Sequence, residues 1–317
     1  MRLHKDKDAF LALLSSVSEA TAIREDIIEK DYYLTLLFSE LAAWQSDLSA
    51  YFKGGTALYK TIGSLKRFSE DIDLTVEVQG CTPSQGKKRL EKAANGYTTL
   101  SRTSDKSRES NAKGSITSVY EYEPVTVVDE SDALQRFGYV KVEATSFTVS
   151  EPIEPLLVSA LLYSGAAPEE QRILRDRYGV FPFEVKTIKM ERIFADKILA
   201  AEFYYQRNKL FDVSKHLFDL ALMMGLDRIC ALISQPDELL KMLEYKRREE
   251  NSRIGSDLAE KPFSRFKLFK AIGSDSELEG TFAEMQRIYV FNDADIITYE
   301  DVKRGMNRLN GILLALD

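Results

Sequence analysis

The spacing of apolar residues changes twice along the chain. Over residues 6–45 they recur every three to four positions, which predicts amphipathic helices. Short alternating segments follow, and these predict strands at residues 51–53, 71–78, 117–122, 139–147 and 183–188. Beyond residue 190 the helical spacing returns, and we expect helices at residues 190–207, 212–224, 226–234, 236–248, 276–290 and 299–315. We therefore predict an α+β fold, with a mixed domain at residues 1–189 and a helical domain at residues 190–317.

Charged and polar residues interrupt this pattern at three places. The triplet Glu29-Lys30-Asp31 begins an apolar helical segment, and we interpret it as a solvated helix face. Residues 151–155 contain two of the eight prolines, which predicts a turn. The polar segment at residues 80–114 holds a predicted helix at 85–95 and two basic groups: Lys87, Lys88, Arg89 and Lys92, then Arg102, Lys106, Arg108 and Lys113. This segment is either an exposed insertion or a surface that contacts nucleic-acid phosphates.

Composition narrows the class of protein. Of the 317 residues, 44% are hydrophobic and 29% are charged, so we expect a proper core rather than disorder. The net charge of −7 argues against a surface that is basic throughout, although it leaves room for a local basic patch. No apolar run approaches the ~18–20 residues that span a membrane, and the first residues lack the apolar segment of a signal peptide. With only two cysteines, far apart, the sequence predicts a cytoplasmic protein.

A Gly-Gly turn followed by a strand with two acids is the chemically most informative stretch. Asp71 and Asp73 are two residues apart, so on a strand both carboxylates point to the same face. Neighbouring carboxylates repel each other unless a cation lies between them, and such oxygen ligands suit Mg²⁺ or Mn²⁺. The turn at Gly54 and Gly55 precedes a short helix predicted at residues 57–61 and offers backbone N–H groups to a phosphate. We expect a site for a nucleoside triphosphate here.

Two better-known motifs do not fit this stretch. A Walker A loop would need a Gly-Lys-Ser/Thr ending, and an EF-hand would need glycine where Val76 stands. What remains is a polymerase-type arrangement, with a glycine turn and helix, an Asp-x-Asp strand and a later acidic strand. Glu143 has the outward position on such a later strand and is the expected third metal carboxylate. In a two-metal mechanism these acids hold ions that activate an attacking hydroxyl and stabilise the leaving pyrophosphate.

Two ionisable residues occupy apolar faces of predicted helices. Lys197 has apolar neighbours one turn before and one turn after it, and Asp219 lies among leucines, a phenylalanine and a methionine. Either Lys197 extends to solvent and Asp219 pairs with Lys215, or both belong to a functional site. Their occurrence in adjacent helices favours the second interpretation, in which the lysine neutralises triphosphate charge. His216, one turn before Asp219, is expected to be a packed, hydrogen-bonded residue.

Six short motifs occur in order between residues 25 and 225. They are Ile-Glu-Lys-Asp-Tyr-Tyr-Leu (28–34), Gly-Gly-Thr-Ala-Leu (54–58), Arg-Phe-Ser-Glu-Asp-Ile-Asp-Leu (67–74), Val-Lys-Val-Glu (140–143), Phe-Ala-Asp-Lys (194–197) and Ser-Lys-His-Leu-Phe-Asp-Leu (214–220). Together they resemble the motifs of the AbiEii/AbiGii family of nucleotidyltransferase toxins, which includes the mycobacterial MenT toxins. The chain departs from the family pattern at Lys215, where arginine is usual, and at Phe218, where tyrosine is usual.

The resemblance implies a polymerase-beta-like nucleotidyltransferase core and a set of site residues. It implies catalytic roles for Asp71, Asp73, Lys197 and Asp219. It implies nucleotide binding at Gly54, Gly55, Thr56, Ser69 and Lys197, and metal binding at Asp71, Asp73 and Glu143. Ser69 also matches a serine that is phosphorylated in certain members, where added negative charge beside the metal site would block it. The helical domain would thus contribute Lys197 and Asp219 to the site.

The function that follows is a metal-dependent nucleotidyltransferase, the toxin of a toxin–antitoxin or phage-defence system. It would transfer a nucleotide from an NTP to RNA, for which the resemblance implies the 3′ end of tRNA, and a cognate antitoxin would be its partner. Two alternatives stay open. The acceptor is a protein side chain, which Ser69 itself could supply, or the chain is an inactive nucleotide- or RNA-binding module. Because Asp71, Asp73 and Glu143 are all present, the inactive alternative is disfavoured.

Overall fold

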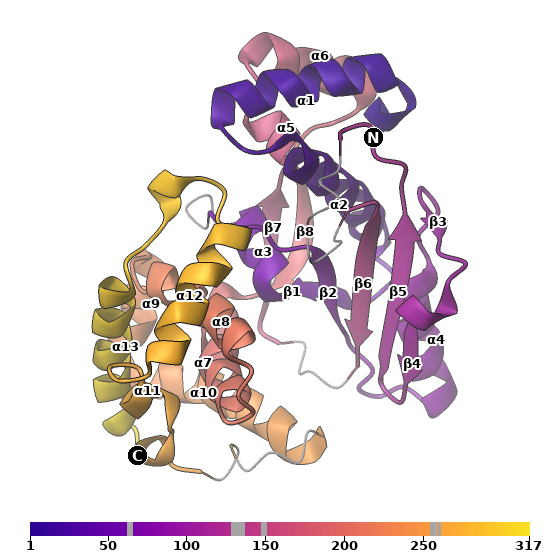
Figure 1. The fold of residues 1–317 in the computed structure, drawn as a ribbon. Coiled ribbons are helices and arrows are strands. Elements are labelled where there is room, and N and C mark those ends of the chain that lie inside the picture. Colours follow the sequence, from indigo (N-terminus) through magenta and orange to yellow (C-terminus); the bar gives the residue numbers. More distant parts are fainter. Residues whose placement is uncertain (62–65, 128–136, 147–150, 254–257, 259–260) are drawn as a thin grey trace. The chain divides into compact units, whose positions relative to one another are not determined.

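The computed structural model describes residues 1–61, 66–127, 137–146, 151–253, 258 and 261–317. The chain divides into two compact units (Figure 1). The first comprises Met1–Gly63 and Phe68–Thr187, and the second comprises Ser64–Arg67 and Ile188–Asp317. A short segment from the early part of the chain is therefore grouped with the C-terminal helices. That the second unit contributes residues to a site on the first stays a prediction.

An eight-stranded sheet forms the centre of the first unit. Its order is β3-β5-β6-β2-β1-β8-β7, and β4 pairs with β5 outside this path. β2 is parallel to β6 and antiparallel to β1, whereas β5 is antiparallel to β6. The strands are β1 (Ala50–Lys53), β2 (Asp71–Val76), β3 (Ser101–Arg102), β4 (Ser110–Ala112), β5 (Ser115–Glu121), β6 (Tyr139–Thr145), β7 (Ile153–Val158) and β8 (Phe183–Ile188).

Helices of the first unit cover one face of this sheet and extend beyond it. They are α1 (Lys7–Thr21), α2 (Glu25–Trp44), α3 (Gly54–Thr61), α4 (Pro83–Asn95), α5 (Leu161–Ser164) and α6 (Pro168–Tyr178), with single 3₁₀ turns η1 (Leu3–Lys5) and η2 (Lys106–Arg108). Thr82 and Gln85 form a capping box that starts α4, as the Thr-Pro-Ser-Gln sequence favours. α1 and α6 lie side by side (Figure 1), where the Ser16 hydroxyl donates to the Glu170 carboxylate at 2.6 Å.

The two faces of the sheet differ in character because side chains alternate along each strand. On one face the ring centre of Phe52 in β1 lies 4.2 Å from the ring centre of Phe38 in α2. On the same face the Tyr120 hydroxyl of β5 donates to the Ala94 carbonyl oxygen of α4 at 2.8 Å. Residues at the alternate positions, including Asp71, point to the other face. α2 and α4 therefore bury the apolar face and leave the acidic residues on the opposite one.

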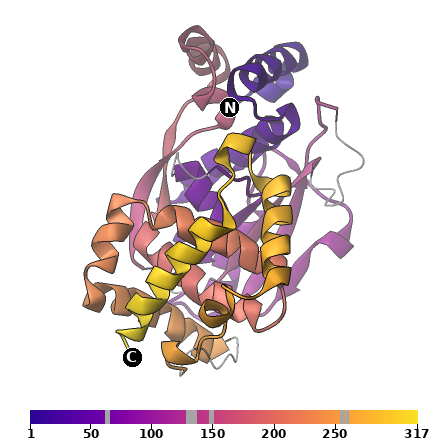
Figure 2. The ribbon, with the colours of Figure 1, turned by 60° about the vertical axis from the view of Figure 1, so that its left-hand side comes forward.

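The second unit is helical in its described part, as the spacing beyond residue 190 predicts. α8 packs against α7, α12 and α13, and α10 packs against α7 (Figures 1 and 2). None of the helices in the described parts of the whole chain is long and apolar enough to cross a membrane. The helices are α7 (Met190–Tyr205), α8 (Leu210–Met223), α9 (Asp227–Ile233), α10 (Pro236–Arg253), α11 (Leu268–Ala271), α12 (Ser276–Tyr289) and α13 (Tyr299–Leu314), with 3₁₀ turns η4 (Phe263–Arg265) and η5 (Asp293–Asp295).

The predicted α+β class is confirmed, and the differences lie in local detail. The turn predicted at residues 151–155 is in part wrong, because β7 begins at Ile153 and contains Pro155. β7 is the last strand in the sheet order, and an edge strand tolerates a residue without an N–H group. α3 begins at Gly54 rather than at residue 57. Phe147, the last residue of one predicted strand, lies outside the described residues.

The charged triplet on α2 is buried, so the prediction of a solvated face is wrong. Glu29, Lys30 and Asp31 are 1%, 0% and 0% exposed. The Glu29 carboxylate accepts the backbone N–H groups of residues 125 and 126 at 2.7 and 3.1 Å. Asp31 accepts from the Tyr59 hydroxyl at 2.5 Å and pairs with the ammonium of Lys60 at 2.5 Å. The triplet therefore ties α2 to other elements of the first unit, as buried charges require.

Candidate active site

The acids of β2 lie on the face of the sheet that α2 and α4 leave open. Asp71 and Asp73 are half-buried, and Ile72 between them is fully buried on the other face. Glu143 of β6 is directly opposite Asp73 in the parallel ladder, and Lys53 of β1 is opposite Asp73 on its other side. The three carboxylates predicted as metal ligands thus occupy neighbouring positions on one face, as the parity of the two strands predicts.

The start of α3 lies directly against one of these acids. Gly54 has a φ of +78°, and a Cβ atom at this position would overlap the Asp73 carboxylate. Only glycine combines this backbone conformation with this close approach. Gly55 and Thr56 follow within the first turn of α3, so their N–H groups belong to a helix N-terminus next to the acids.

We call the site formed by residues 54–56 and by Ser69, Asp71, Asp73 and Glu143 the acidic corner. In this corner, the side chains of Thr56 and Ser69 connect the start of α3 to the start of β2. The buried Thr56 hydroxyl donates to the carbonyl oxygen of Asp71 at 2.5 Å and lies 2.8 Å from the Ser69 hydroxyl. The side chain of Thr56 therefore positions the start of β2, and its backbone N–H is the group left for a phosphate. Ser69 is half-buried beside it.

Burial raises the pKa values of two of the acids, Asp71 and Glu143. The pKa of Asp71 is raised chiefly by burial, while Lys141 and Lys30 act in the opposite direction. The pKa of Glu143 is raised by burial and then by the negative charge of Asp71. Lys141 stands opposite Asp71 in the ladder, and its Nζ lies 3.3 Å from Asp71 Oδ2. The corner therefore carries negative charge that a cation would relieve.

The chemistry of this donor set fits a hard divalent cation. All three side chains offer carboxylate oxygens, the ligands that Mg²⁺ and Mn²⁺ prefer. Within the described residues, no group of three His, Cys, Asp or Glu side chains already converges closely enough to hold a metal ion. Asp71, Asp73 and Glu143 as metal ligands therefore stay a prediction that donor chemistry and repulsion support.

Lys30 is a neighbour of this site that the sequence analysis did not assign to it. Its side chain is fully buried, lies 3.7 Å from the Glu70 carboxylate and is 4.9 Å from the centre of the Tyr139 ring. Its positive charge opposes the rise that burial causes in the pKa of Asp71. Lys30 belongs to the motif at residues 28–34, which precedes the glycine turn in the sequence. Its local sequence, however, predicted only a solvated helix face.

In the second unit, Lys197 and Asp219 form one buried ion pair with a third member. Asp219 Oδ2 lies 2.5 Å from Lys197 Nζ and 2.6 Å from Arg67 Nη2, and Asp219 Oδ1 accepts from Arg67 Nε at 2.6 Å. Burial alone would raise the pKa of Asp219, but Arg67 and Lys197 outweigh it and hold that pKa at about 2. The alternatives in which Lys197 extends to solvent and Asp219 pairs with Lys215 are therefore wrong. Arg67 is a partner that the sequence analysis missed.

His216 is packed next to this ion pair but is only partly as expected. It is stacked on the Tyr204 ring, and burial lowers its pKa well below the usual range. Among the described residues its Nδ1 has no hydrogen-bond partner, contrary to the expectation of a hydrogen-bonded histidine. Lys215 donates to the Tyr289 hydroxyl at 3.2 Å and lies over the Tyr289 ring.

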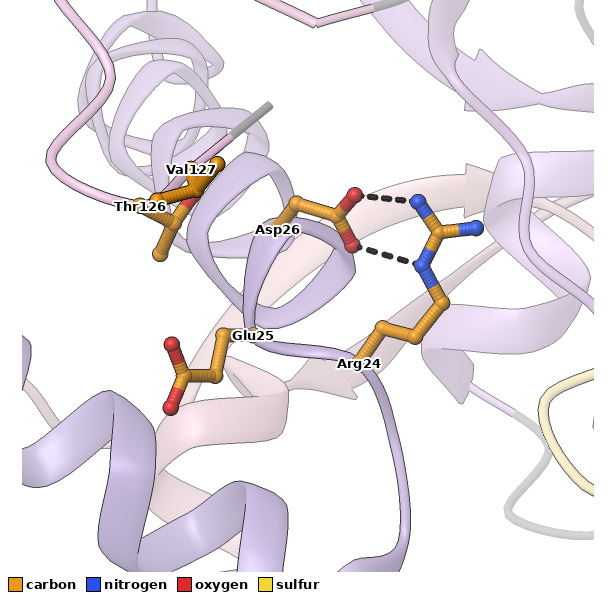
Figure 3. Close-up of a pocket in the computed structure, with 5 residues that line it drawn as sticks. All are labelled: Arg24, Glu25, Asp26, Thr126 and Val127. Carbon is orange, nitrogen blue, oxygen red and sulfur yellow. Dashed lines mark hydrogen bonds and ion pairs between the residues drawn. The ribbon is translucent and has the colours of Figure 1, made fainter. Parts of the chain in front are cut away.

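A pocket of about 370 Å³ lies elsewhere on the first unit (Figure 3). Its lining residues are Arg24, Glu25, Asp26, Thr126 and Val127, and none of the predicted site residues belongs to it. Arg24 and Asp26 form an ion pair in its lining, and Glu25 accepts from the Ser15 hydroxyl at 2.5 Å. Arg24 and Asp26 neutralise each other and Glu25 accepts a hydrogen bond, so we place the candidate nucleotide site at the acids of β2 and β6 rather than at this pocket.

Comparisons with known proteins found similar solved structures and a matching family. A search of curated proteins found no match. Among solved structures, MenT4, a nucleotidyltransferase toxin from Mycobacterium tuberculosis, is 12% identical, with a TM-score of 0.48 over 97% of this chain and 98% of that one. JHP933 from Helicobacter pylori is 14% identical, with a TM-score of 0.43 over 90% of this chain and 93% of that one.

The family comparison covers most of the chain. The family described as "Nucleotidyl transferase AbiEii toxin, Type IV TA system" matches residues 35–302. That range includes the glycine turn, the Asp-x-Asp strand, the acidic strand of Glu143, and the helices that carry Lys197 and Asp219. The chain therefore belongs to the AbiEii family of nucleotidyltransferase toxins of type IV toxin–antitoxin systems.

Proposed function

We propose that this protein is a metal-dependent toxin that transfers a nucleotide from an NTP to RNA, with the 3′ end of tRNA as the acceptor. The observation that carries the proposal is the corner where Gly54 starts α3 against Asp73, with Asp71 and Glu143 on the same sheet face. A helix N-terminus for phosphate and carboxylates for a cation are the two halves of a nucleotide site. Family membership supports the transfer chemistry.

Each residue of the corner has a distinct task in this proposal. Asp71, Asp73 and Glu143 would hold Mg²⁺ or Mn²⁺, which when bound supplies charge stabilisation for the transferred phosphoryl group. Gly54, Gly55 and Thr56 present backbone N–H groups to the triphosphate. The absence of a side chain at Gly54 lets the chain approach both the acid and the phosphates.

We further propose that Lys197 and Asp219 of the second unit complete the site. In this proposal Lys197 neutralises triphosphate charge, and Asp219 fixes the orientation of that lysine, as their 2.5 Å ion pair supports. Ser69 would bind nucleotide and also serve as the regulatory position. A phosphate on Ser69 would place negative charge beside Asp71 and disturb its contact with Thr56.

The test is nucleotide transfer by the purified protein. It is incubated with each labelled NTP, Mg²⁺ or Mn²⁺ and total RNA, and the RNA is then resolved by size. We expect label in the tRNA fraction, and we expect D71N to lose at least ~10³-fold in rate. D47N, which neutralises an exposed acid of the first unit, is the matched control and should retain activity. Absence of transfer with all four NTPs from folded protein contradicts the proposal.

The same incubation separates RNA from protein acceptors. Intact-mass spectrometry after exposure to NTP reports any group added to the protein itself. A mass gain at Ser69 without RNA labelling would favour the protein-directed alternative. Unchanged toxicity of a D71N strain in cells would favour the inactive binding module.

A further inference from the structure

The basic residues of the segment at 101–113 are largely paired within that segment. Glu109, whose side chain is only 7% exposed, pairs with Arg102 at 2.5 Å and with Lys106 at 3.0 Å. It also accepts the backbone N–H of Val119 at 3.3 Å. Because Arg102 and Lys106 share the carboxylate of Glu109, they stabilise the segment between β3 and β5 and are less available to phosphates.

Arg108 of the same excursion is placed differently. Its guanidinium lies over the Tyr139 ring, 3.9 Å from the ring centre, and its side chain is 35% exposed. Among the described residues its ion-pair partner is Glu121, whose carboxylate lies 3.8 Å away, too far for a hydrogen bond. Stacked guanidinium and phenol groups present both donors and aromatic surface.

Tyr139 connects Arg108 to the candidate active site. It begins β6, and its side chain points to the same face as those of Lys141 and Glu143. Successive same-face positions on a strand are ~7 Å apart, so Tyr139 is one such step from Lys141, whose ammonium contacts Asp71. The buried ammonium of Lys30 lies 4.9 Å from the same ring. Arg108, Tyr139 and Lys141 therefore form a basic and aromatic surface that leads along β6 to the acids, and Lys30 is buried next to it.

This surface and the glycine turn lie on opposite sides of β2. The sheet order places β6 on one side of β2, and β1, which leads into α3, on the other. The proposed phosphate site at Gly54 approaches the acids from the β1 side. The β6 side is then the one left for the second substrate.

We infer that Arg108 and Tyr139 bind the RNA acceptor, next to the terminal RNA nucleotide to which the new nucleotide is added. This inference rests on the proposed function, and it adds a subsite to it. Single-stranded RNA is the chemistry that fits, because a base can stack on the partly exposed Arg108 guanidinium, which itself lies over the Tyr139 ring, while Lys141 meets a phosphate. α4 is excluded from this role, because it packs on the opposite face of the sheet, where Tyr120 contacts Ala94.

The experiment measures RNA and NTP binding separately. Fluorescence anisotropy with a short labelled single-stranded oligoribonucleotide is compared for the wild-type protein, R108A, R108K and K88A. We expect R108A to weaken RNA binding about tenfold and R108K to have an intermediate effect, because lysine keeps the charge but loses the planar fork. K88A removes an exposed charge from α4 and should bind RNA like the wild type. NTP affinity, measured by calorimetry, should not change in any variant.

Each outcome bears on either the subsite or the proposed function. Wild-type RNA affinity in R108A, a loss confined to NTP affinity, or no oligoribonucleotide binding by the wild type would each overturn the subsite. If the wild type binds RNA and R108A does not, the subsite is supported even where no nucleotide transfer occurs, and the proposed function alone fails. If transfer occurs and the KM for RNA is the same in R108A, the subsite alone fails. Circular dichroism confirms that R108A is folded.

Discussion

At the scale of single residues, Gly54 shows how closely backbone and chemistry are linked in this site. Its φ of +78° and its contact with Asp73 each disfavour any side chain. An L-residue in this conformation is strained by ~1–2 kcal/mol. The first methyl group added here would also have to displace a carboxylate that the proposed mechanism needs.

Replacement of Gly54 by alanine is therefore expected to reduce both activity and stability. We expect nucleotide transfer to fall at least ~100-fold and the free energy of unfolding to fall by ~1–2 kcal/mol. G280A is the matched control, because Gly280 lies exposed within α12 with no atom near its would-be Cβ. In that helix alanine should stabilise the protein by up to ~1 kcal/mol. An active G54A enzyme would contradict the arrangement at the start of α3.

Asp219 makes a second residue-scale prediction, which concerns pH. Its folded pKa of about 2 is below the ordinary 3.8, so it stabilises the fold above pH ~4 and loses this contribution as the pH falls towards 2. D219N should lower the free energy of unfolding at pH 7 by ~3 kcal/mol, because Arg67 and Lys197 stay buried. Urea unfolding from pH 5 to pH 2 should show the gap to the wild type narrowing below pH 4.

E284Q is the control for this measurement. Glu284 is an exposed acid of the same unit, and its neutralisation should change the free energy of unfolding by less than ~0.5 kcal/mol at any of these pH values. A gap between D219N and the wild type that does not depend on pH would show that the Asp219 charge is not the source of stabilisation.

Single residues could be predicted from the sequence where the evidence is local. The parity of Asp71 and Asp73 follows from a strand period of two, and the burial of Lys197 and Asp219 follows from their helical neighbours. The partner of Asp219 does not, because Arg67 is 152 positions away in the chain. No spacing rule connects residues that tertiary structure alone brings together.

At the scale of elements, α2 is the clearest case of tertiary structure overriding local pattern. Three consecutive charged residues resemble a solvated face, but each is buried and has a partner on another segment of the first unit. Leu161 at the start of α5 donates its backbone N–H to Asp31 at 2.6 Å, and Lys60 of α3 pairs with the same carboxylate. Asp31 thus links three helices, and α2 is held by charge as well as by apolar packing.

Neutralisation of Asp31 tests this arrangement. D31N should lower the free energy of unfolding by ~3 kcal/mol, because the buried Lys60 loses its counter-charge. E19Q, at an exposed position of α1, should change it by less than ~0.5 kcal/mol. Chemical denaturation followed by circular dichroism compares the two variants. Equal stability of D31N and E19Q would restore the interpretation of a dispensable charged face.

The strands, too, could be predicted where local sequence is sufficient and could not where the sheet order decides. β2, β6 and β8 have clear alternation or apolar runs, and their positions agree with the predictions to within two residues for the described part of the chain. β7 could not be recognised, because Pro152 and Pro155 favour a turn by local rules. Only its place at the edge of the sheet makes Pro155 acceptable, and sheet order is not visible in local sequence.

At the scale of the whole molecule, the second unit is assembled from two separate parts of the chain. Arg67 pairs in an antiparallel bridge with Val290, and the N–H of Phe291 donates to the carbonyl oxygen of Lys66 at 3.0 Å. The ion pair to Asp219 adds a buried side-chain link between the same two parts. Composition alone, which changes near residue 189, cannot reveal that a short early segment belongs with the C-terminal helices.

A double-mutant cycle measures how strongly this link couples the two parts. D219N should destabilise the protein by ~3 kcal/mol, because it leaves Arg67 and Lys197 buried without their carboxylate. R67M should destabilise it by ~2 kcal/mol, because Asp219 loses its hydrogen bonds from the guanidinium but keeps the ammonium of Lys197. The double variant should be less destabilised than the sum of the two by ~2 kcal/mol, because the second change removes a charge that the first has already left unpaired. R67M combined with E284Q should be additive to within ~0.5 kcal/mol. If the Arg67–Asp219 pair is equally additive, the bridge to Val290 rather than the ion pair holds the early segment in the second unit.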